Sequence, residues 1–293
     1  MNPCIERCKA KMIAAVALLL LGGFLFFQDM ATQAQNGRFA LLVDIEDAIG
    51  PAASDYVARA IQTAQRDKAE LVILRLDTPG GLDKSMRAIN HEILASPVPV
   101  VGYVAPSGAR AASAGTYILY ACHIAAMAPG TNLGAATPVQ IGGGFPSVPR
   151  PDKPTDEKKP VHPTSADKAV SDAVAYIRSL AQMRGRNVEW AEKAVREAAS
   201  LSAEDAFAQQ VVGFLAANVA DLLKQLDGQV VTTEFGQRQL NTQGLTVTRY
   251  EVDWRTRILA VITNPNIAYI LMLIGVYGLL FEFYSPGAIV PGQ

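Results

Sequence analysis

The first half of the chain alternates between short apolar runs and longer amphipathic segments. The apolar runs have the length of buried strands and lie at 39–45, 71–76, 98–104 and 122–127. The amphipathic segments have apolar residues at helical spacing and lie at 51–65, at 83–96 and from Ala112 onward. This alternation predicts an α/β fold in which helices cover a parallel sheet.

The second half of the chain begins with a segment rich in proline and glycine. Residues 142–163 hold six prolines and three consecutive glycines, which predicts a flexible loop. An amphipathic helix is expected at 165–183, with Thr164 or Ser165 as its N-cap. The elements expected after it are a helix at 188–199, a helix opened by a capping box at 202–205, and a hairpin within 229–252.

Both ends of the chain are strongly apolar. Arg7, Lys9 and Lys11 precede the run Met12–Phe27, a pattern typical of an export signal or of an uncleaved anchor. Either form delivers the following domain to the far side of the membrane from the cytoplasm. A second run, Ile267–Tyr284, has the length and the flanking tyrosines of a transmembrane helix.

Composition narrows the function classes further. Half of the residues are hydrophobic, 18% are charged and the formal net charge is −1, so neither a disordered chain nor a basic nucleic-acid-binding surface is expected. The three cysteines and three histidines match no zinc-binding spacing. We therefore expect no metal and no cofactor.

Two segments that follow predicted strands are candidates for chemistry. In Asp77–Gly81 (DTPGG), paired glycines let the backbone approach a ligand and present N–H groups to it, although an ordinary strand-to-helix turn has the same composition. Ser113 lies among small residues (AASAGTY) at an expected helix N-terminus, where the N–H of Ala114 can stabilise an oxyanion. A lone serine among alanines is more often a packing residue, and only a partner base changes that interpretation.

The choice of base falls between histidine and lysine. His91, His123 and His162 lie in a helix, an apolar strand and the proline-rich loop, so a Ser-His-Asp triad is poorly supported. Lysine must be neutral to act as a base, which requires burial or a nearby positive field. Lys168 fits best, because it lies in the first turn of an amphipathic helix next to the apolar stripe of that helix, where the helix dipole disfavours its charged form. By spacing alone, a surface lysine is the commoner interpretation. The lysines of the charged loop are expected to be solvated; they are Lys153, Lys158 and Lys159.

Four motifs in order give the chain its family resemblance. They are DTPGG (77–81), SAGTY (113–117), MAPGTNLGAATP (127–138) and K-x7-YIRSLAQ (168–182). This series resembles the NfeD-type membrane-bound serine proteases, which belong to the ClpP/crotonase superfamily with the signal peptide peptidase A group. One departure concerns the helix that follows Ser202: related peptidases often have glycine near the position of Gln210, and here Gly213 comes later.

The resemblance implies a Ser-Lys dyad with Ser113 as nucleophile and Lys168 as general base. It also implies that the backbone N–H groups of Gly81 and Ala114 form the oxyanion hole. We expect substrate to bind in an extended form along Gly80–Gly81. Apolar pockets are expected to be lined by Leu82, Met86 and Tyr117, although all of these also suit a core.

The resemblance gives a domain plan. The plan comprises a signal peptide or anchor at 1–36, a ClpP-like serine protease domain at 37–228, a hairpin and connector at 229–256, and a transmembrane helix at 267–284. Longer family members continue with further spans and a small β-barrel, so we expect the membrane module to be truncated at residue 293.

The resemblance also implies an activity and a partner, and two other functions compete with that activity. The implied activity is cleavage of apolar segments in stomatin-like membrane proteins by a homo-oligomer on the extracytoplasmic side of the cell membrane. A non-catalytic scaffold for a stomatin-like partner is the alternative, and it would not need Ser113 or Lys168. A crotonase-like acyl-CoA enzyme would be cytoplasmic, and the export signal argues against it.

Overall fold

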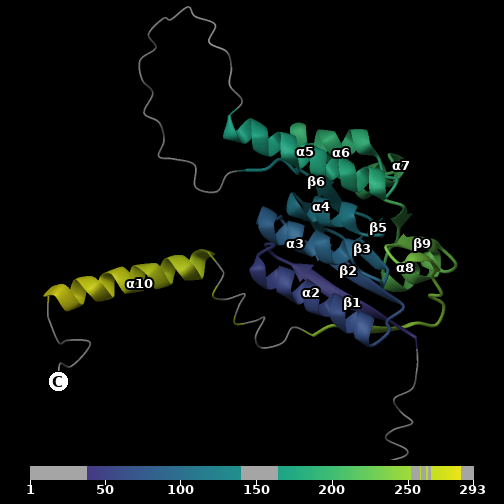
Figure 1. The fold of residues 1–293 in the computed structure, drawn as a ribbon, viewed down its shortest axis with the longest axis horizontal. Helices are drawn as coiled ribbons and strands as arrows, with labels where there is room; N and C mark the ends of the chain where they lie inside the picture. Colours follow the sequence, from purple (N-terminus) through teal and green to yellow (C-terminus); the bar gives the residue numbers. More distant parts are fainter. Residues whose placement is uncertain (1–37, 140–163, 252–257, 259–261, 263–264, 285–293) are drawn as a thin grey trace, which may run out of the picture. The chain divides into compact units, whose positions relative to one another are not determined.

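The computed structural model describes residues 38–139, 164–251, 258, 262 and 265–284 (Figure 1). The expected export segment at 1–36 and the expected loop at 142–163 lie outside the described residues, as does most of the segment that joins the hairpin region to the last helix.

The main sheet has six strands in the order β11-β1-β2-β3-β5-β8, and every neighbouring pair is parallel. The strands are β1 (Phe39–Glu46), β2 (Leu71–Asp77), β3 (Val100–Val104), β5 (Ile124–Met127), β8 (Phe214–Leu215) and β11 (Thr246–Arg249). The expected parallel α/β sheet is therefore confirmed.

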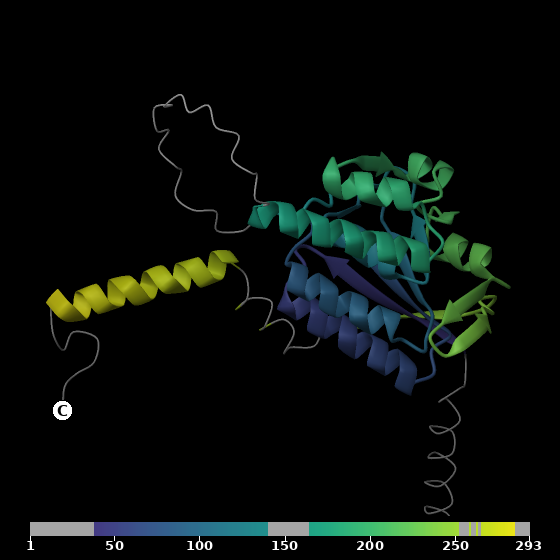
Figure 2. The same ribbon diagram turned by 45° about the horizontal axis from the view of Figure 1, so that its top comes forward.

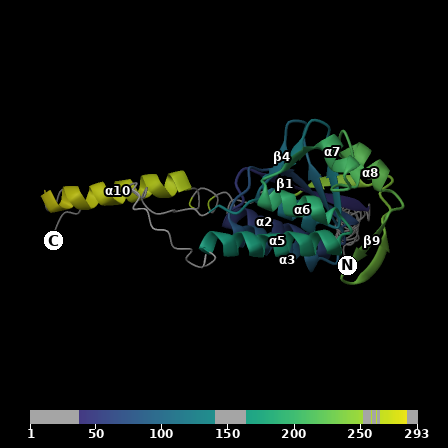
Figure 3. The same cartoon turned by 90° about the horizontal axis from the view of Figure 1, so that it is seen from above.

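Both faces of this sheet are covered over β1, β2, β3 and β5, which explains why these strands are mostly apolar runs. On β1, Leu41 and Val43 point into a core shared with the helices α2 (Pro51–Arg66), α3 (Asp83–Leu94) and α4 (Ala114–Ala121). Ala40 and Leu42 point to the opposite face, where they pack with α8 (Val219–Leu226) and β9 (Val230–Thr233). In Figure 3, α8 and β9 lie on the other side of the domain from α2.

The second half of the domain adds helices and two small sheets. The helices α5 (Ser165–Met183) and α6 (Val188–Arg196) pack against each other (Figure 2), and α7 (Ala203–Ala208) follows. The short strands β4 (Arg110–Ala112), β6 (Asn132–Gly134) and β7 (Ser200–Ser202) form a three-stranded sheet. β9 pairs with β10 (Gly236–Gln239) as an antiparallel hairpin, as the sequence predicts.

Some elements differ from the sequence expectation. The helix expected at 188–199 ends at Arg196, and the strand expected from Val98 begins at Val100. The segment after Pro129, expected to be a loop, contains β6. Within 229–252 the structure has the hairpin and also β11, which joins the main sheet beside β1.

Two helix N-termini carry the caps that the sequence predicts. The Thr164 hydroxyl accepts from the N–H of Asp167, whose carboxylate accepts from the N–H of Thr164, so both halves of a capping box are present. The Ser202 hydroxyl accepts from the N–H of Asp205 and opens α7.

The turn after α7 is formed without glycine. Gln210 adopts a left-handed conformation with φ +57°, and the N–H of Val211 donates to the carbonyl of Ala206 at 2.8 Å. This is the hydrogen bond of a Schellman turn, in which glycine is the usual residue. Gln210 thus takes the expected turn conformation at the steric cost of a Cβ atom.

The apolar run at 267–284 forms the helix α10 (Pro265–Tyr284). Its large apolar side chains are exposed around the helix, including Tyr269, Leu279 and Phe283. Within the part of the chain that the structure describes, no helix meets the length and hydropathy expected of a membrane span, so the expected transmembrane helix is not confirmed.

Candidate active site

Ser113 lies at the junction between β4 and α4 in a strained backbone conformation. Its φ is +52° and its ψ is −118°, a region that residues with a Cβ atom seldom adopt. Ser113 occupies the N-cap position of α4, yet its hydroxyl makes no capping hydrogen bond. The backbone thus holds the hydroxyl out of the role that serine usually has at a helix N-terminus.

A pair of buried threonines holds the backbone around Ser113. The Thr78 hydroxyl donates to the carbonyl of Asp47 at 2.6 Å and accepts from the N–H of Gly80 at 3.1 Å. The Thr116 hydroxyl donates to the carbonyl of Ala111 at 2.8 Å and accepts from the N–H of Gly134 at 3.1 Å. Each threonine therefore fixes one of the loops that meet at the serine.

The two glycine-containing motifs are packed directly against each other. A Cβ atom on Gly115, in the first turn of α4, would lie 2.7 Å from Cγ2 of Thr78, so only glycine fits at position 115. The backbones also pair, because the N–H of Thr78 donates to the carbonyl of Arg110 at 2.7 Å and the N–H of Ala112 donates to the carbonyl of Thr78 at 3.1 Å. The DTPGG and SAGTY motifs thus form one site.

Gly80 lies beside the Ser113 side chain. A Cβ atom built on Gly80 would be 2.6 Å from Cβ and 3.1 Å from Oγ of Ser113. Gly80 also has φ +112°, which favours glycine independently of the contact. The structure therefore brings this expected substrate-binding residue together with the expected nucleophile.

The backbone N–H groups of Gly81 and Ala114 are available for a ligand. Gly81 forms a parallel bridge with Ile49, in which the Ile49 N–H donates to Gly80 and the Leu82 N–H donates to Ile49, so the N–H and carbonyl of Gly81 itself point away. Ala114 is the first residue of α4, where helical N–H groups lack intrahelical partners. Among the described residues, neither N–H group has a hydrogen-bond partner.

Lys168 lies at the same end of the helix layer as Ser113. The Tyr117 and Tyr176 rings stack with their centroids 6.1 Å apart, and Arg184 donates to the carbonyl of Ala121 at the other end, so α4 and α5 run in the same direction. Ser113 precedes Tyr117 by four residues and Lys168 precedes Tyr176 by eight, so both lie on the N-terminal side of this stack.

The environment of Lys168 differs from the sequence expectation in one respect. The sequence places it beside an apolar stripe, whereas the structure leaves its side chain exposed. The physical reason is its position in the helix, because the apolar stripe of α5 becomes buried only from Ala173 and Val174 onward. The Lys168 side chain thus lacks, in this single chain, the burial that the sequence leads us to expect for a base.

The residues expected to line apolar pockets divide into two groups. The Leu82 side chain is 45% exposed and remains a candidate for contact with substrate. Met86 and Tyr117 are buried in the core, and the Tyr117 hydroxyl donates to the carbonyl of Ala136 at 3.0 Å. For Met86 and Tyr117 the structure favours the core interpretation, since neither presents its side chain to solvent.

The C-terminal end of α4 is held by the guanidinium groups of two partly buried arginines. Arg186 donates to the carbonyls of Leu119, Tyr120 and Cys122 at 2.7 to 2.9 Å, and Arg184 donates to Ala121 at 3.0 Å. Burial lowers the pKa of Arg186 to about 10, so it stays charged at neutral pH and complements the negative end of the helix dipole.

His123 is unsuited to proton transfer at the site. Its Nδ1 accepts from the N–H of Val100, at the end of α4 opposite to Ser113. Burial, with the nearby charges of Arg184 and Arg186, lowers the pKa of His123 to about 3. His91 is exposed on α3, and His162 lies outside the described residues.

Sequence reasoning missed the residues that support the site. Thr78, Thr116 and Arg186 carry no motif of their own, and Arg186 lies 73 positions beyond Ser113 in the sequence. Thr78 and Thr116 do lie inside the two motifs, so a threonine within two residues of a motif glycine was the available signal. Arg186 gave none.

Comparisons with known proteins indicate the family of the chain. The family model "NfeD1b, N-terminal domain" matches residues 40–147. The chain is 36% identical over 243 residues to the membrane-bound protease PH1510 of Pyrococcus horikoshii, covering 81% of this chain and 51% of that protein. It is 28% identical over 265 residues to the membrane protein NfeD1b of Bacillus subtilis, covering 86% of this chain and 52% of that protein.

Solved structures extend the match to the fold. A lysine-to-alanine variant of the 1510-N membrane-bound stomatin-specific protease, in complex with a substrate peptide, has a TM-score of 0.67 and 32% identity, covering 78% of this chain and 99% of that one. A serine-to-alanine variant of 1510-N has a TM-score of 0.65 and 33% identity, covering 75% of this chain and all of that one.

The α/β fold with its parallel sheet has the architecture of ClpP-like proteases, which these solved structures share. The chain belongs to the NfeD family. It spans about half the length of the curated relatives that it matches.

Proposed function

We propose that this chain is the protease part of a membrane-bound serine endopeptidase, with Ser113 as the nucleophile and Lys168 as the general base. The observation that carries the proposal is the backbone of Ser113. A positive φ at a residue with a Cβ atom is strain that the surrounding hydrogen bonds maintain, and such strain clusters at functional sites. It leaves the Ser113 hydroxyl without a capping hydrogen bond at the positive end of the α4 dipole.

The proposed reaction is acyl transfer through a covalent intermediate. Oγ of Ser113 attacks the scissile carbonyl carbon while its proton passes to Nζ of Lys168. The N–H groups of Gly81 and Ala114 stabilise the oxyanion, and the proton then moves from Lys168 to the departing amine as the C–N bond breaks. Water hydrolyses the acyl-enzyme by the same proton route.

The side-by-side helices support the pairing of Ser113 with Lys168. At 1.5 Å per residue, Ser113 lies about 6 Å and Lys168 about 12 Å along their helices from the stack of Tyr117 on Tyr176. The four-carbon stem of a lysine can span the difference between these levels. The pairing therefore requires the Lys168 side chain to extend back toward the N-terminus of α4.

We further propose that substrate binds as an added strand along Gly80–Gly81. The carbonyl of Gly81 points away from Ile49 and has no hydrogen-bond partner among the described residues, so this edge can pair with a peptide backbone. A glycine edge selects little by side chain. Selectivity for apolar residues would come from exposed neighbours such as Leu82.

The proposed setting is the extracytoplasmic surface of the cell membrane, where a homo-oligomer cleaves apolar segments of stomatin-like proteins. Support comes from the relatives, which are named a membrane-bound protease and a membrane protein, and from 1510-N, which is named stomatin-specific. The exposed apolar side chains of α10 suit attachment to a membrane. Attachment raises the effective concentration of substrates in the same bilayer.

One observation favours the alternative of a non-catalytic scaffold for a stomatin-like partner. A base in a Ser-Lys dyad needs burial or a nearby positive charge to be neutral at working pH, and Lys168 is exposed in this chain. The scaffold predicts that replacement of Lys168 leaves every property of the protein unchanged.

The test is cleavage of an apolar membrane-protein peptide by the full chain and by Lys168→Arg. The guanidinium stays protonated, so the variant is expected to lose turnover by at least about a thousandfold while its melting curve is unchanged. Placing Asp or Lys beside the scissile bond should slow the wild type by about 10- to 100-fold, because an unpaired charge would be buried. Full activity in Lys168→Arg would refute the dyad, and equal rates on charged and apolar peptides would refute the substrate class.

A further inference from the structure

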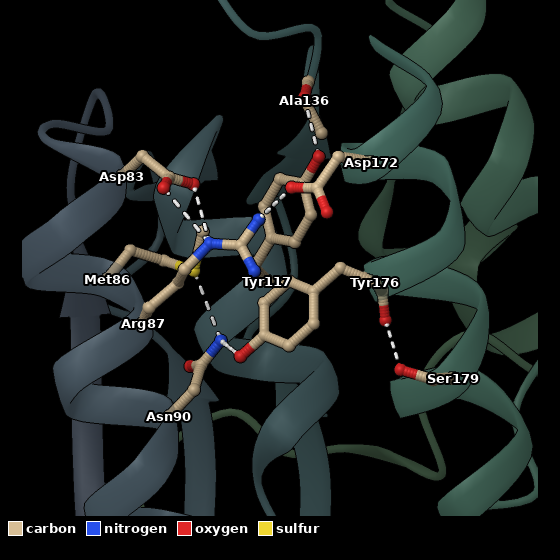
Figure 4. Close-up of polar contacts among 9 residues, drawn as sticks. All are labelled: Asp83, Met86, Arg87, Asn90, Tyr117, Ala136, Asp172, Tyr176 and Ser179. Atoms are coloured by element: carbon tan, nitrogen blue, oxygen red, sulfur yellow. Dashed lines mark hydrogen bonds and ion pairs between the residues drawn. The ribbon is translucent and has the colours of Figure 1, made fainter. Parts of the chain in front are cut away.

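Arg87 ties α3 to α5 (Figure 4). Its Nε pairs with Asp83 on its own helix at 3.0 Å, and its Nη2 pairs with Asp172 on α5 at 2.5 Å. Its guanidinium carbon lies 4.4 Å from the centroid of the Tyr176 ring. The Tyr176 hydroxyl accepts from Asn90, so the surface under the guanidinium is itself fixed.

The carboxylate that Arg87 holds lies one helical turn from the proposed base. Lys168 and Asp172 are four residues apart on α5, the spacing at which oppositely charged side chains on a helix meet. If Asp172 were released, Lys168 would be a cation within its reach. An ion pair between them would hold Lys168 in the protonated form, which cannot accept the proton of Ser113.

We propose that Arg87 is a positioning residue that keeps Lys168 usable as a base by binding Asp172. This inference rests on the proposed dyad. Arg87 acts in two ways, and both favour the neutral form of Lys168. It occupies the carboxylate with a group that is always charged, and it adds a positive charge to the helix face that carries Lys168.

Among the described residues, the other carboxylates around this part of α5 already have partners. Asp167 accepts from Thr164 in the capping box, and Asp83 pairs with Arg87. On α6, Glu192 pairs with Arg178, more than two helical turns beyond Lys168. α4 contributes the buried and uncharged Tyr117. Asp172 is therefore the carboxylate whose release matters most to Lys168.

The experiment measures the pH dependence of kcat/KM in the full chain and in Arg87→Gln. The variant should shift the ascending limb to higher pH by about half a unit, the scale of an exposed ion pair, and lose about threefold in rate below the midpoint. The rate on the high-pH plateau should stay within about twofold. Adding Asp172→Asn to Arg87→Gln should move the ascending limb of the pH profile most of the way back to its wild-type position.

Arg178→Gln is the matched control. It removes an arginine from α5 that pairs with a carboxylate on a neighbouring helix, but at a distance from Lys168. It should leave the limb in place. An unmoved limb in Arg87→Gln, an equal rate loss at every pH, or no recovery in the double variant would overturn the proposal by reducing Arg87 to a structural residue.

A second readout separates this proposal from the proposed function. The titration midpoint of Lys168 can be followed by NMR of protein labelled with ¹³C-lysine, with Lys168→Arg used for assignment. A midpoint that rises in Arg87→Gln supports the electrostatic effect of Arg87 on Lys168, whereas full cleavage by Lys168→Arg would refute only the dyad on which the positioning role rests. A midpoint that does not rise overturns it even if Lys168→Arg is inactive and the dyad holds.

Discussion

The two ends of α4 are built in opposite ways. At the C-terminal end, the carbonyls of residues 119 to 122 all accept hydrogen bonds from the guanidinium groups of Arg184 and Arg186. At the N-terminal end, Ser113 is strained, its hydroxyl caps nothing, and the N–H of Ala114 has no partner among the described residues. The backbone groups of residues 119 to 122 therefore have hydrogen-bond partners, and we call this the closed end of α4. Ser113 and Ala114 form its open end, where the hydroxyl and the N–H lack such partners among the described residues.

The contrast shows how a short helix can carry a reactive group. Strain and unpaired N–H groups persist only where the surrounding structure determines the backbone. Here that structure comprises the hydrogen bonds of Thr78 and Thr116 at the open end and the two arginines at the closed end. Stability at the closed end offsets what the open end costs.

The largest effect is expected from a Cβ atom placed against the open end. In Gly80→Ala, the added atom would lie 2.6 Å from Cβ of Ser113, and the φ of +112° would be strained. Displacement of the nucleophile should lower kcat/KM by about a hundredfold or more, as small misplacements of reacting groups do. Peptide cleavage and thermal melting of the variant measure the two consequences separately.

Gly108→Ala is the control for Gly80→Ala. Gly108 also has a positive φ, +90°, but an added Cβ atom would meet nothing within 4 Å. It should show a similar backbone cost of about 1 kcal/mol without loss of activity. Equal activity in the two variants would mean that Gly80 does not position Ser113.

At the closed end, the expected effect is on stability. Arg186→Met removes donors from three buried carbonyls and should lower the free energy of unfolding by about 2–4 kcal/mol. Arg184→Met removes the donor of one carbonyl and should cost about 1 kcal/mol. Urea unfolding gives both values. A cost for Arg186→Met no greater than that for Arg184→Met would contradict the role given to the closed end.

The smallest effect is expected from a substitution that relieves backbone strain at Gln210, away from the candidate site. Gln210 has φ +57° in the turn after α7 and no proposed function there. Gln210→Gly should raise the free energy of unfolding by about 0.5–1 kcal/mol and leave cleavage unchanged. A destabilised variant would show that the Gln210 side chain contributes more than its backbone costs.

The sequence predicted most of the sheet and the helices around it, because apolar runs buried on two faces and amphipathic helices leave clear periodicities. It did not predict β11 beside β1, since Thr246–Arg249 is exposed along its length and shows no apolar pattern. It missed the short sheet of β4, β6 and β7, whose strands are only three residues long.

Within the site, the motifs located residues that are close together in the sequence. They did not indicate the residues, distant in the sequence, that support the site. The meeting of Gly80 with Ser113 follows from two loops that succeed neighbouring strands, and the sequence order indicates both loops. The exposure of Lys168 depends on where α5 begins to be buried. The arginine cap of α4 depends on tertiary packing that no local pattern records.

The central claim is that the strained Ser113 is a nucleophile. Its most direct test is mass spectrometry of the full chain after reaction with an alkyl fluorophosphonate, which forms a stable covalent bond with an activated serine. We expect a single adduct that peptide mapping assigns to Ser113, loss of that adduct in Ser113→Ala, and a rate of labelling lowered by at least about a hundredfold in Lys168→Arg. An adduct on another residue, or labelling of Ser113→Ala at the wild-type rate, would contradict the account.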